Sequence, residues 1–467
     1  MALLPRLALV LALAPFGCQR PTPPASAAPP EPATPRPAAP PSAPADTPPG
    51  TPDAGPARDL PDAGTPAVPG QAQRPPPDLN VLLLSVDSLR ADMPWTGYPR
   101  PIAPFLTELA AQGVVYTQAY ALSSYTSMSV GGLLGGRYPG ELARDGFFFG
   151  TYPARVLMFP EVLHEAGVRT LSAHAHGYFR AHRAGFDQGF DVWELIPNLR
   201  WSNVTDLEIT SDRHAALARR ILGEEANTRG RFFAWFHFMD PHDQYRAHPE
   251  VPAYGRSNRD RYDAEVTFTD LHLRQLVTWV RAQPWGTRTA IIVTADHGEA
   301  FGEHGHYRHG FELWQELVHV PWIFVLPGAA PRRIEARRSH LDLAPTVLDL
   351  LGVSPNPEFT GQSLVPELYG APAPDRDVIV DLPRTSDNDR RRALLHGRHK
   401  LIAYGDDSRF ELYDLVADPG EQHNLARTDR ETFLAMVQRY REAQSSLRVA
   451  NPYQCRTLRG APPGRGW

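Results

Sequence analysis

The stretch Ile291–Glu303 reads IIVTADHGEAFGE and is the most informative part of the chain. It begins with a β-branched apolar run, which is typical of a buried strand. The run leads to Asp296, His297 and Gly298, which set a carboxylate beside an imidazole before a glycine that allows the backbone to turn. In open α/β sheets, ligands bind outside the carboxyl ends of the strands. Asp296 and His297 are therefore candidate metal ligands.

Strands and helices alternate on both sides of this stretch. Asn80–Val86 is a continuous apolar run, which predicts a central parallel strand. Pro104–Gln112 has a helical pattern that ends at Gly113. Such alternation predicts an α/β fold with a mixed, mostly parallel central sheet and helices on both faces. The same patterns predict strands at Val114–Ala119, Thr170–Ala173, Arg231–Phe238 and Val320–Leu326, and helices at Met128–Leu134, Asp212–Leu222, Tyr262–Arg281 and Leu343–Leu351.

The pattern changes after about residue 391. Short strands are predicted at Ala393–His396, Lys400–Ala403 and Phe410–Tyr413, followed by a helix at Glu431–Arg441. We therefore expect a main α/β domain over residues 78–390 and a small α+β subdomain over residues 391–467.

The N-terminal region has the features of an export signal and a tether. Residues 1–18 contain Arg6, an apolar run and a small residue before Cys18. They predict a lipoprotein-type signal peptide with Cys18 lipidated, with cleavage nearby by ordinary signal peptidase as the alternative. Residues 19–77 are rich in Pro and Ala, which predicts a disordered tether. These features indicate a lipid-anchored protein of the bacterial cell envelope, at the periplasmic or outer-membrane surface.

Charge and cysteine content argue against two classes of protein, those that bind nucleic acid and those stabilised by a framework of disulfides. The net charge is −5, so no basic face is expected and nucleic acid is not a predicted partner. The two cysteines are Cys18 and Cys455. If Cys18 carries lipid, no intrachain disulfide can form.

Five segments of the main domain carry polar motifs in a characteristic order. The segments are VDSLRAD at Val86–Asp92, Thr126–Ser129 followed by GGRYP at Gly135–Pro139, DPHD at Asp240–Asp243, ADHGEAFGEHG at Ala295–Gly305, and His309-Gly310. Together they resemble the sulfatase branch of the alkaline phosphatase superfamily, and the resemblance extends from about Asn80 to Leu425.

This resemblance implies a metal site. Asp87, Asp296 and His297 match metal ligands of the family, and a further acidic ligand of the family would fall on Ser88. Two carboxylates and an imidazole suit Mn²⁺ or Zn²⁺ better than Ca²⁺, which prefers oxygen ligands alone. We therefore expect a divalent ion, Mn²⁺ or Zn²⁺, with Ca²⁺ and Mg²⁺ as alternatives.

The nucleophile position of the family falls on Thr126. Formylglycine sulfatases carry Cys or Ser there, in a C-x-P-S-R signature whose Pro and Arg are both missing here. Formylglycine is therefore not expected. Threonine nucleophiles occur in similar proteins that act on phosphate esters, such as phosphoethanolamine transferases. The hydroxyl would lie at a helix N-terminus, which favours an alkoxide. Ser127 and Ser129 are the alternatives if the register differs.

Several histidines match or replace family residues. His242 and His309 match histidines that contact the ester in the family, and we expect both to be catalytic. His237 lies within a predicted strand and is interpreted as structural. The family's G-K-W-H segment falls at His174–Gly177 without its lysine, so His174 or His176 would take part in binding the anion.

The combined expectation is a sulfatase-like, metal-dependent hydrolase of sulfate or phosphate esters. Its substrate would be an anionic ester of a small molecule, lipid or glycan. A phosphoethanolamine-type transferase and a catalytically silent binding protein of the cell surface are the alternatives.

The tether leads to a first prediction. A nonspecific protease should remove residues 19–77 from the native protein without lowering the thermal stability of the remaining domain, because a segment poor in apolar residues contributes no core. The test is mass spectrometry of the digest together with its unfolding midpoint. A protease-resistant N-terminal segment would contradict the tether.

Overall fold

The computed structural model of the protein describes residues 74–200, 202, 208 and 210–450. The predicted signal peptide, Cys18 and the predicted tether lie outside these residues, apart from the last few residues before 78. Within the described part, no helix combines the length and the apolar character needed to cross a membrane.

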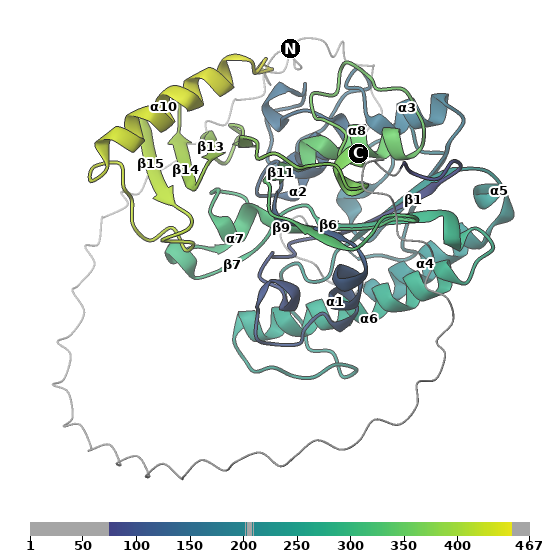
Figure 1. Ribbon diagram of the computed structural model, residues 1–467. Coiled ribbons are helices and arrows are strands. Elements are labelled where there is room, and N and C mark those ends of the chain that lie inside the picture. Colours follow the sequence, from purple (N-terminus) through teal and green to yellow (C-terminus); the bar gives the residue numbers. More distant parts are fainter. Residues whose placement is uncertain (1–73, 201, 203–207, 209, 451–467) are drawn as a thin grey trace, which may run out of the picture. The chain divides into compact units, whose positions relative to one another are not determined.

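A nine-stranded mixed sheet forms the centre of the domain (Figure 1). Strand β9 runs antiparallel to both of its neighbours, and the other strand pairs of this sheet are parallel. The predicted mixed, mostly parallel sheet is therefore confirmed. The order is β10 (Arg332–Ile334), β2 (Val114–Tyr120), β9 (His319–Val325), β6 (Thr289–Ala295), β1 (Asn80–Val86), β5 (Phe232–Phe238), β3 (Arg169–His174) and β4 (Val192–Leu195), with β11 (Arg338–Ser339) also paired to β2.

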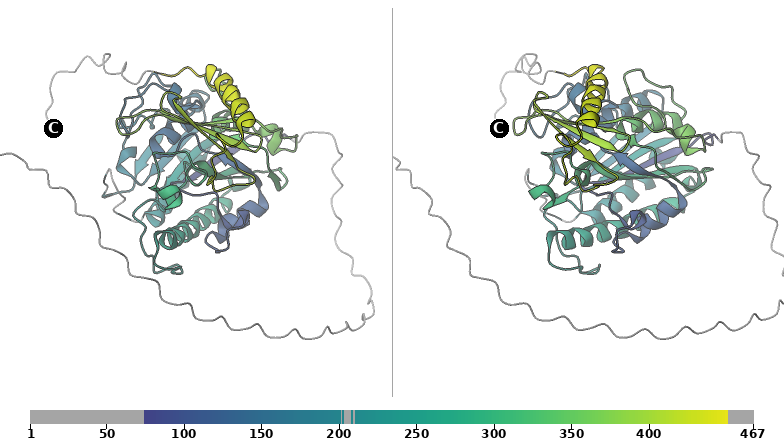
Figure 2. Two further views of the ribbon diagram at one scale, coloured as in Figure 1. Left: turned by 90° about the vertical axis from the view of Figure 1, so that its left-hand side faces the viewer. Right: turned by 60° about the vertical axis from the view of Figure 1, so that its left-hand side comes forward.

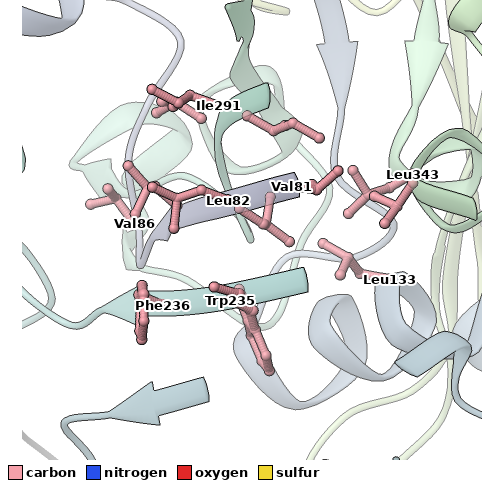
Figure 3. Close-up of a cluster of buried hydrophobic side chains, with 14 of the residues drawn as sticks. Val81, Leu82, Val86, Leu133, Trp235, Phe236, Ile291 and Leu343 are labelled. Atoms are coloured by element: carbon pink, nitrogen blue, oxygen red, sulfur yellow. The ribbon is translucent and has the colours of Figure 1, made fainter. Parts of the chain in front are cut away.

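Strand β1 is the buried centre of this sheet. All seven of its residues are buried, because β6 and β5 flank it and helices cover both faces. Figure 3 shows its side chains between Ile291 of β6 and Trp235 of β5, with Leu133 and Leu343 beside them. A strand without a solvent-facing side must be apolar along its length, which explains the run NVLLLSV.

Helices pack against both faces of the sheet, as Figure 1 shows. One group comprises α1 (Pro104–Gln112), α4 (Ser211–Gly223) and α6 (Asn258–Arg281), and the other comprises α2 (Thr126–Gly135), α3 (Phe159–Glu165) and α8 (Leu343–Leu350). The shorter elements are α5 (Glu225–Thr228), α7 (Gln315–Val318), α9 (Val365–Leu368), β7 (Ala300–Phe301) and β8 (Tyr307–Arg308).

Two helices begin earlier than their apolar pattern predicts. Helix α6 starts after Ser257, whose hydroxyl accepts a hydrogen bond from the Asp260 backbone N–H in a capping box. Helix α2 starts at Thr126, two residues before the predicted start at Met128. Polar first turns hide such starts, because only apolar residues reveal the helical periodicity in a sequence.

The C-terminal subdomain is an antiparallel sheet covered by one helix. It contains β12 (Val378–Leu382), β13 (Arg391–His396), β14 (His399–Tyr404) and β15 (Arg409–Asp414), and Figure 2 shows α10 (Arg430–Ser445) lying against it. Met436, Val437 and Tyr440 of α10 are buried against this sheet. Strand β12 precedes the boundary expected at residue 391, since a short apolar run does not reveal which sheet it joins.

Gly298 is required by a close approach of two chain segments. Its backbone does not adopt the left-handed conformation expected of a turn glycine. Instead, a Cβ atom there would lie 2.1 Å from the backbone oxygen of Glu316, and the Gly298 N–H donates to Leu317 O at 2.9 Å. The absence of a side chain at Gly298 therefore allows α7 to pack directly against the backbone next to His297.

A substitution at this contact should reduce stability. Gly298→Ala forces a backbone shift, and overpacking of this kind costs about 1–3 kcal/mol of unfolding free energy. Gly230→Ala is the matched control, because a Cβ there has nothing within 4 Å. Urea unfolding of both variants tests the contact, and equal midpoints would show that it does not constrain the fold.

Candidate active site

The register of three parallel strands brings the candidate site together. Val86 of β1 pairs with Ala295 of β6 and with Phe238 of β5. Asp87 and Asp296 follow these paired residues directly, so their side chains meet at the carboxyl edge of the sheet. Both carboxylates are buried.

His237 joins this pair from strand β5. Its Nε2 lies 3.2 Å from Asp87 Oδ2 and 3.9 Å from Asp296 Oδ2, and its Nδ1 lies 2.8 Å from the Ser85 hydroxyl. Asp87, His237 and Asp296 offer three potential ligand atoms within 4.8 Å of one another. The structure thus places His237, which we interpreted as structural, within a candidate metal-binding group.

His297 faces the same point in the protonation state of a metal ligand. Its Nδ1 lies 2.9 Å from the carbonyl oxygen of Gly298, which can only accept, so the neutral ring has its lone pair on Nε2. That lone pair faces Asp296 Oδ2 at 3.3 Å and Asp87 Oδ1 at 3.7 Å. Asp296 Oδ2 is buried and finds no hydrogen-bond partner among the described residues.

These contacts fit a cation. A lone pair and a carboxylate oxygen repel each other at this distance unless a cation or a proton lies between them. Burial raises the pKa of Asp296, and the negative charge of Asp87 raises it further. Burial would also raise the pKa of Asp87, but the charge of His242 and the hydrogen bond from His237 hold it well below its usual value. Two oxygen and two nitrogen donors suit a divalent transition metal.

Thr126 lies at the edge of this cluster. It is the first residue of α2, and its hydroxyl lies 3.1 Å from Asp87 Oδ2 and 3.2 Å from His297 Nε2. The two alternative hydroxyls are engaged elsewhere: Ser127 donates to Phe148 O and Ser129 donates to Ser123 O, each at 2.8 Å.

Ser88 supports the two carboxylates. Its hydroxyl donates to Asp87 Oδ1 at 2.8 Å, and its backbone N–H donates to Asp296 Oδ1 at 3.3 Å. These bonds orient both carboxylates and reduce the cost of burying them. Ser88 thus holds the ligands in place at the position where an acidic ligand was expected from the family.

His242 and His309 lie together near Thr126. Their ring centroids are 5.0 Å apart, and the His309 ring lies 4.2 Å from that of His297. A fully buried carboxylate, Glu299, accepts at 3.1 Å from His309 and at 2.9 Å from the Tyr245 hydroxyl. Burial would raise the pKa of Glu299, but the charge and hydrogen bond of His309 lower it. Sequence reasoning missed Glu299, although its place within ADHGE was a signal.

A pocket of about 510 Å³ opens beside these residues. Thr126, His242 and His309 all line it, so the three predicted catalytic residues share one cavity. The remaining lining residues are Phe148, Phe149, His176, Tyr178, Phe179, Ser202, Met239, Asp243, Arg308, Phe311 and Asp387.

The structure distinguishes between two of the other candidates for anion binding. His174 is fully buried and stacks on Phe179, whereas His176 lines the pocket. Arg90 of the VDSLRAD segment lies away from the pocket lining, and its guanidinium is engaged by Asp92, Glu303 and the Glu299 carbonyl oxygen.

Sequence comparisons agree with this geometry. Residues 79–353 match the family Sulfatase, and residues 302–447 match the family N-sulphoglucosamine sulphohydrolase, C-terminal. The Delta 4,5-hexuronate-2-O-sulfatase of Bacteroides thetaiotaomicron is 31% identical over 31% of this chain and 32% of its own length. The Ulvan-active sulfatase of Formosa agariphila is 23% identical over 76% of this chain and 78% of its own length. For three of the curated relatives the match covers only 32%, 36% and 39% of the relative's length.

The fold is also found in solved structures. The phosphonate monoester hydrolase of Agrobacterium radiobacter superposes with a TM-score of 0.65 at 20% identity, covering 79% of this chain and 95% of that protein. With more than half of its residues matching the family profile and this cluster at the carboxyl edge of its sheet, the chain belongs to the sulfatase family.

Proposed function

We propose that the protein is a metal-dependent hydrolase that cleaves a phosphate or phosphonate ester with Thr126 as nucleophile. The observation that carries the proposal is the position of the Thr126 hydroxyl, within 3.2 Å of both Asp87 and His297. A hydroxyl there can transfer its proton to Asp87 Oδ2, the oxygen that accepts its hydrogen bond, and attack an ester held in the adjacent pocket.

Asp87, His237, Asp296 and His297 would hold the metal ion, with Mn²⁺ or Zn²⁺ favoured by the mixed oxygen and nitrogen donors. Such an ion supplies positive charge for the alkoxide and for the oxygens of the transferred group. The ring orientations are already set, because Ser85 contacts His237 Nδ1 and Gly298 O contacts His297 Nδ1.

The chain's own residues would perform the remaining steps. Thr126 Oγ1 attacks phosphorus, the bond to the leaving alcohol breaks, and that alcohol takes a proton from His309 or His242. Water then attacks the phosphothreonine, which releases the phosphate or phosphonate and restores the Thr126 hydroxyl. Glu299 keeps the His309 ring oriented toward the pocket.

Threonine at the nucleophile position favours phosphorus as the reacting atom. Threonine carries a single hydroxyl on its Cβ. A phosphate or sulfate group bound to Thr126 Oγ1 can therefore leave only when water attacks the phosphorus or sulfur atom of that group. The phosphonate monoester hydrolase among the structural neighbours shows the fold alone.

A sulfate ester is the second candidate, supported by family membership and by relatives named as sulfatases, among them the hexuronate-2-O-sulfatase and the Ulvan-active sulfatase. On that reading, a sulfated sugar would replace the phosphate ester in the same pocket. A phosphoethanolamine-type transferase would use the same first step, with an alcohol in place of water in the second step.

A catalytically silent binding protein is the least favoured alternative. Burying two carboxylates and two imidazoles side by side costs folding free energy, and such clusters are typical of functional sites. The proposed location is the bacterial cell envelope, with Cys18 lipidated, on the support of the N-terminal sequence.

The nucleophile assignment is tested by substitution. Thr126→Ala should lower kcat about 10³-fold or more, because the covalent step is lost, with little change in unfolding midpoint. Thr126→Ser should retain part of the activity, since the hydroxyl remains. Initial rates with phosphate monoesters, diesters, phosphonate esters and aryl sulfates provide the measurement.

Ser127→Ala is the matched control, because its hydroxyl is the neighbouring alternative and bonds to Phe148 O. It should change kcat only a few-fold. Full turnover by Thr126→Ala would refute the assignment. Turnover of sulfate esters without turnover of phosphorus esters would establish the second candidate.

Metal removal gives a separate prediction. After a chelator has removed the metal, adding the ion back at a concentration a hundredfold above its Kd should raise the free energy of unfolding by about 3 kcal/mol. Asp296→Asn and His237→Gln should lose this increase together with the bound metal measured by elemental analysis. His319→Gln is the control, because that ring bonds to Thr117 O on another part of the sheet. Unchanged metal content in Asp296→Asn would place the ion elsewhere.

A further inference from the structure

Three phenylalanines form a corner at the mouth of the pocket. We call Phe148, Phe149 and Phe311 the aromatic clamp. The Phe148 and Phe311 rings are 5.6 Å apart and 25° from parallel, and Phe149 meets Phe148 edge-on at 5.4 Å. Phe149 and Phe311 remain 36% and 48% exposed. Apolar rings left open to solvent around a polar centre are typical of a ligand-binding surface.

The clamp is held in a fixed position relative to the candidate nucleophile. Ser127, which follows Thr126, donates to the Phe148 carbonyl oxygen at 2.8 Å. The Phe148 ring stacks on Tyr125 at 4.2 Å, and a Cβ at Gly310 would lie 2.9 Å from it. Tyr125, Ser127 and Gly310, which come from the segments on both sides of the site, therefore lie directly against Phe148.

The charges around the pocket do not suit a polyanion. Arg308 is paired with Asp243 at 3.0 Å, and Asp387 adds a further negative charge. His176 Nδ1 accepts a hydrogen bond from the Tyr178 backbone N–H at 3.1 Å. The acidic and basic side chains among the described lining residues, Asp243, Asp387 and Arg308, thus sum to a formal charge of −1.

From this surface we infer a substrate class, which rests on the proposed function. We propose that the aromatic clamp binds the alcohol part of the ester, and that this part is one uncharged ring with an apolar face. The ring would lie against Phe148 and Phe311, with the ester group directed toward Thr126. A glycan carrying additional sulfate or carboxylate groups would be repelled by Asp387, whereas the charge of Asp243 is already balanced by Arg308.

Both an aromatic ring and the apolar face of a neutral sugar ring could occupy this clamp. An aromatic ring gains stacking energy, and a sugar ring gains contact area with polar atoms at its edge. The phenyl ester and the glucose-6 ester of phosphate therefore distinguish an aromatic ring from a sugar ring in the clamp. The methyl ester of phosphate has no ring and serves as the reference. A disaccharide ester with two additional sulfates tests whether charged glycans are excluded.

The decisive experiment compares the Phe149→Ala/Phe311→Ala double variant with the wild type. For the phenyl or the glucose-6 ester, kcat/KM should fall about tenfold or more through KM, whereas the methyl ester should change less than about twofold. Phe147→Ala is the matched control, because Phe147 belongs to the same loop and is 53% exposed but does not line the pocket. An equal loss for all esters would overturn the clamp.

Charge exclusion has its own readout. The wild type should turn over the sulfated disaccharide ester less efficiently than either ester of an uncharged ring, and Asp387→Asn should narrow the difference. A preference of the wild type for the sulfated disaccharide would overturn the inference.

The clamp can also be tested without turnover, by calorimetric measurement of the binding of free phenol and of glucose. A protein that hydrolyses no ester but loses phenol or glucose binding in the double variant would contradict the proposed function and leave the clamp in place. A wild-type protein that hydrolyses phosphorus esters but binds neither compound would contradict the clamp and leave the proposed function in place.

Discussion

Two carboxylates, Asp87 and Asp296, lie buried side by side at the carboxyl edge of a parallel sheet, and the rest of the site depends on neutralising them. Burial of like charges is costly, and it persists only where partners compensate. Hydrogen bonds from Ser88 and the imidazole of His237 supply part of that compensation. The neutral Nε2 of His297 adds a further electron pair at the same point, which a cation would balance.

The compensating groups are fixed by the most rigid part of the fold. The Trp235 indole donates to Ser85 at 2.8 Å, and the Ser85 hydroxyl contacts His237 at 2.8 Å, so a polar chain runs between β5 and β1. Buried chains of this kind must be fully satisfied, which restricts each side chain to one orientation. A site supported by packed strands keeps its geometry better than one supported by loops.

The rim of the pocket is built differently. The aromatic clamp lies on segments outside the central strands, and its rings touch residues that neighbour Thr126 and His309. Loop residues can change without disturbing the buried cluster, because they contribute little to the core. The two regions differ accordingly: the strand ends hold the charges, and the aromatic clamp lies on the rim, where we propose that it selects the alcohol.

Local sequence patterns predicted much of the fold and part of the site. Strand β1 was predictable because burial on both faces demands an uninterrupted apolar run, and Asp87 and Asp296 were predictable because they follow such runs. The role of His237 was not, since a histidine inside FFAWFHF acquires its meaning only when β5 pairs with β1. Likewise Gly298 is needed because Glu316 approaches it, not because it turns. Periodicity is encoded within each segment, whereas strand order, register and close approach arise only when distant segments pack together.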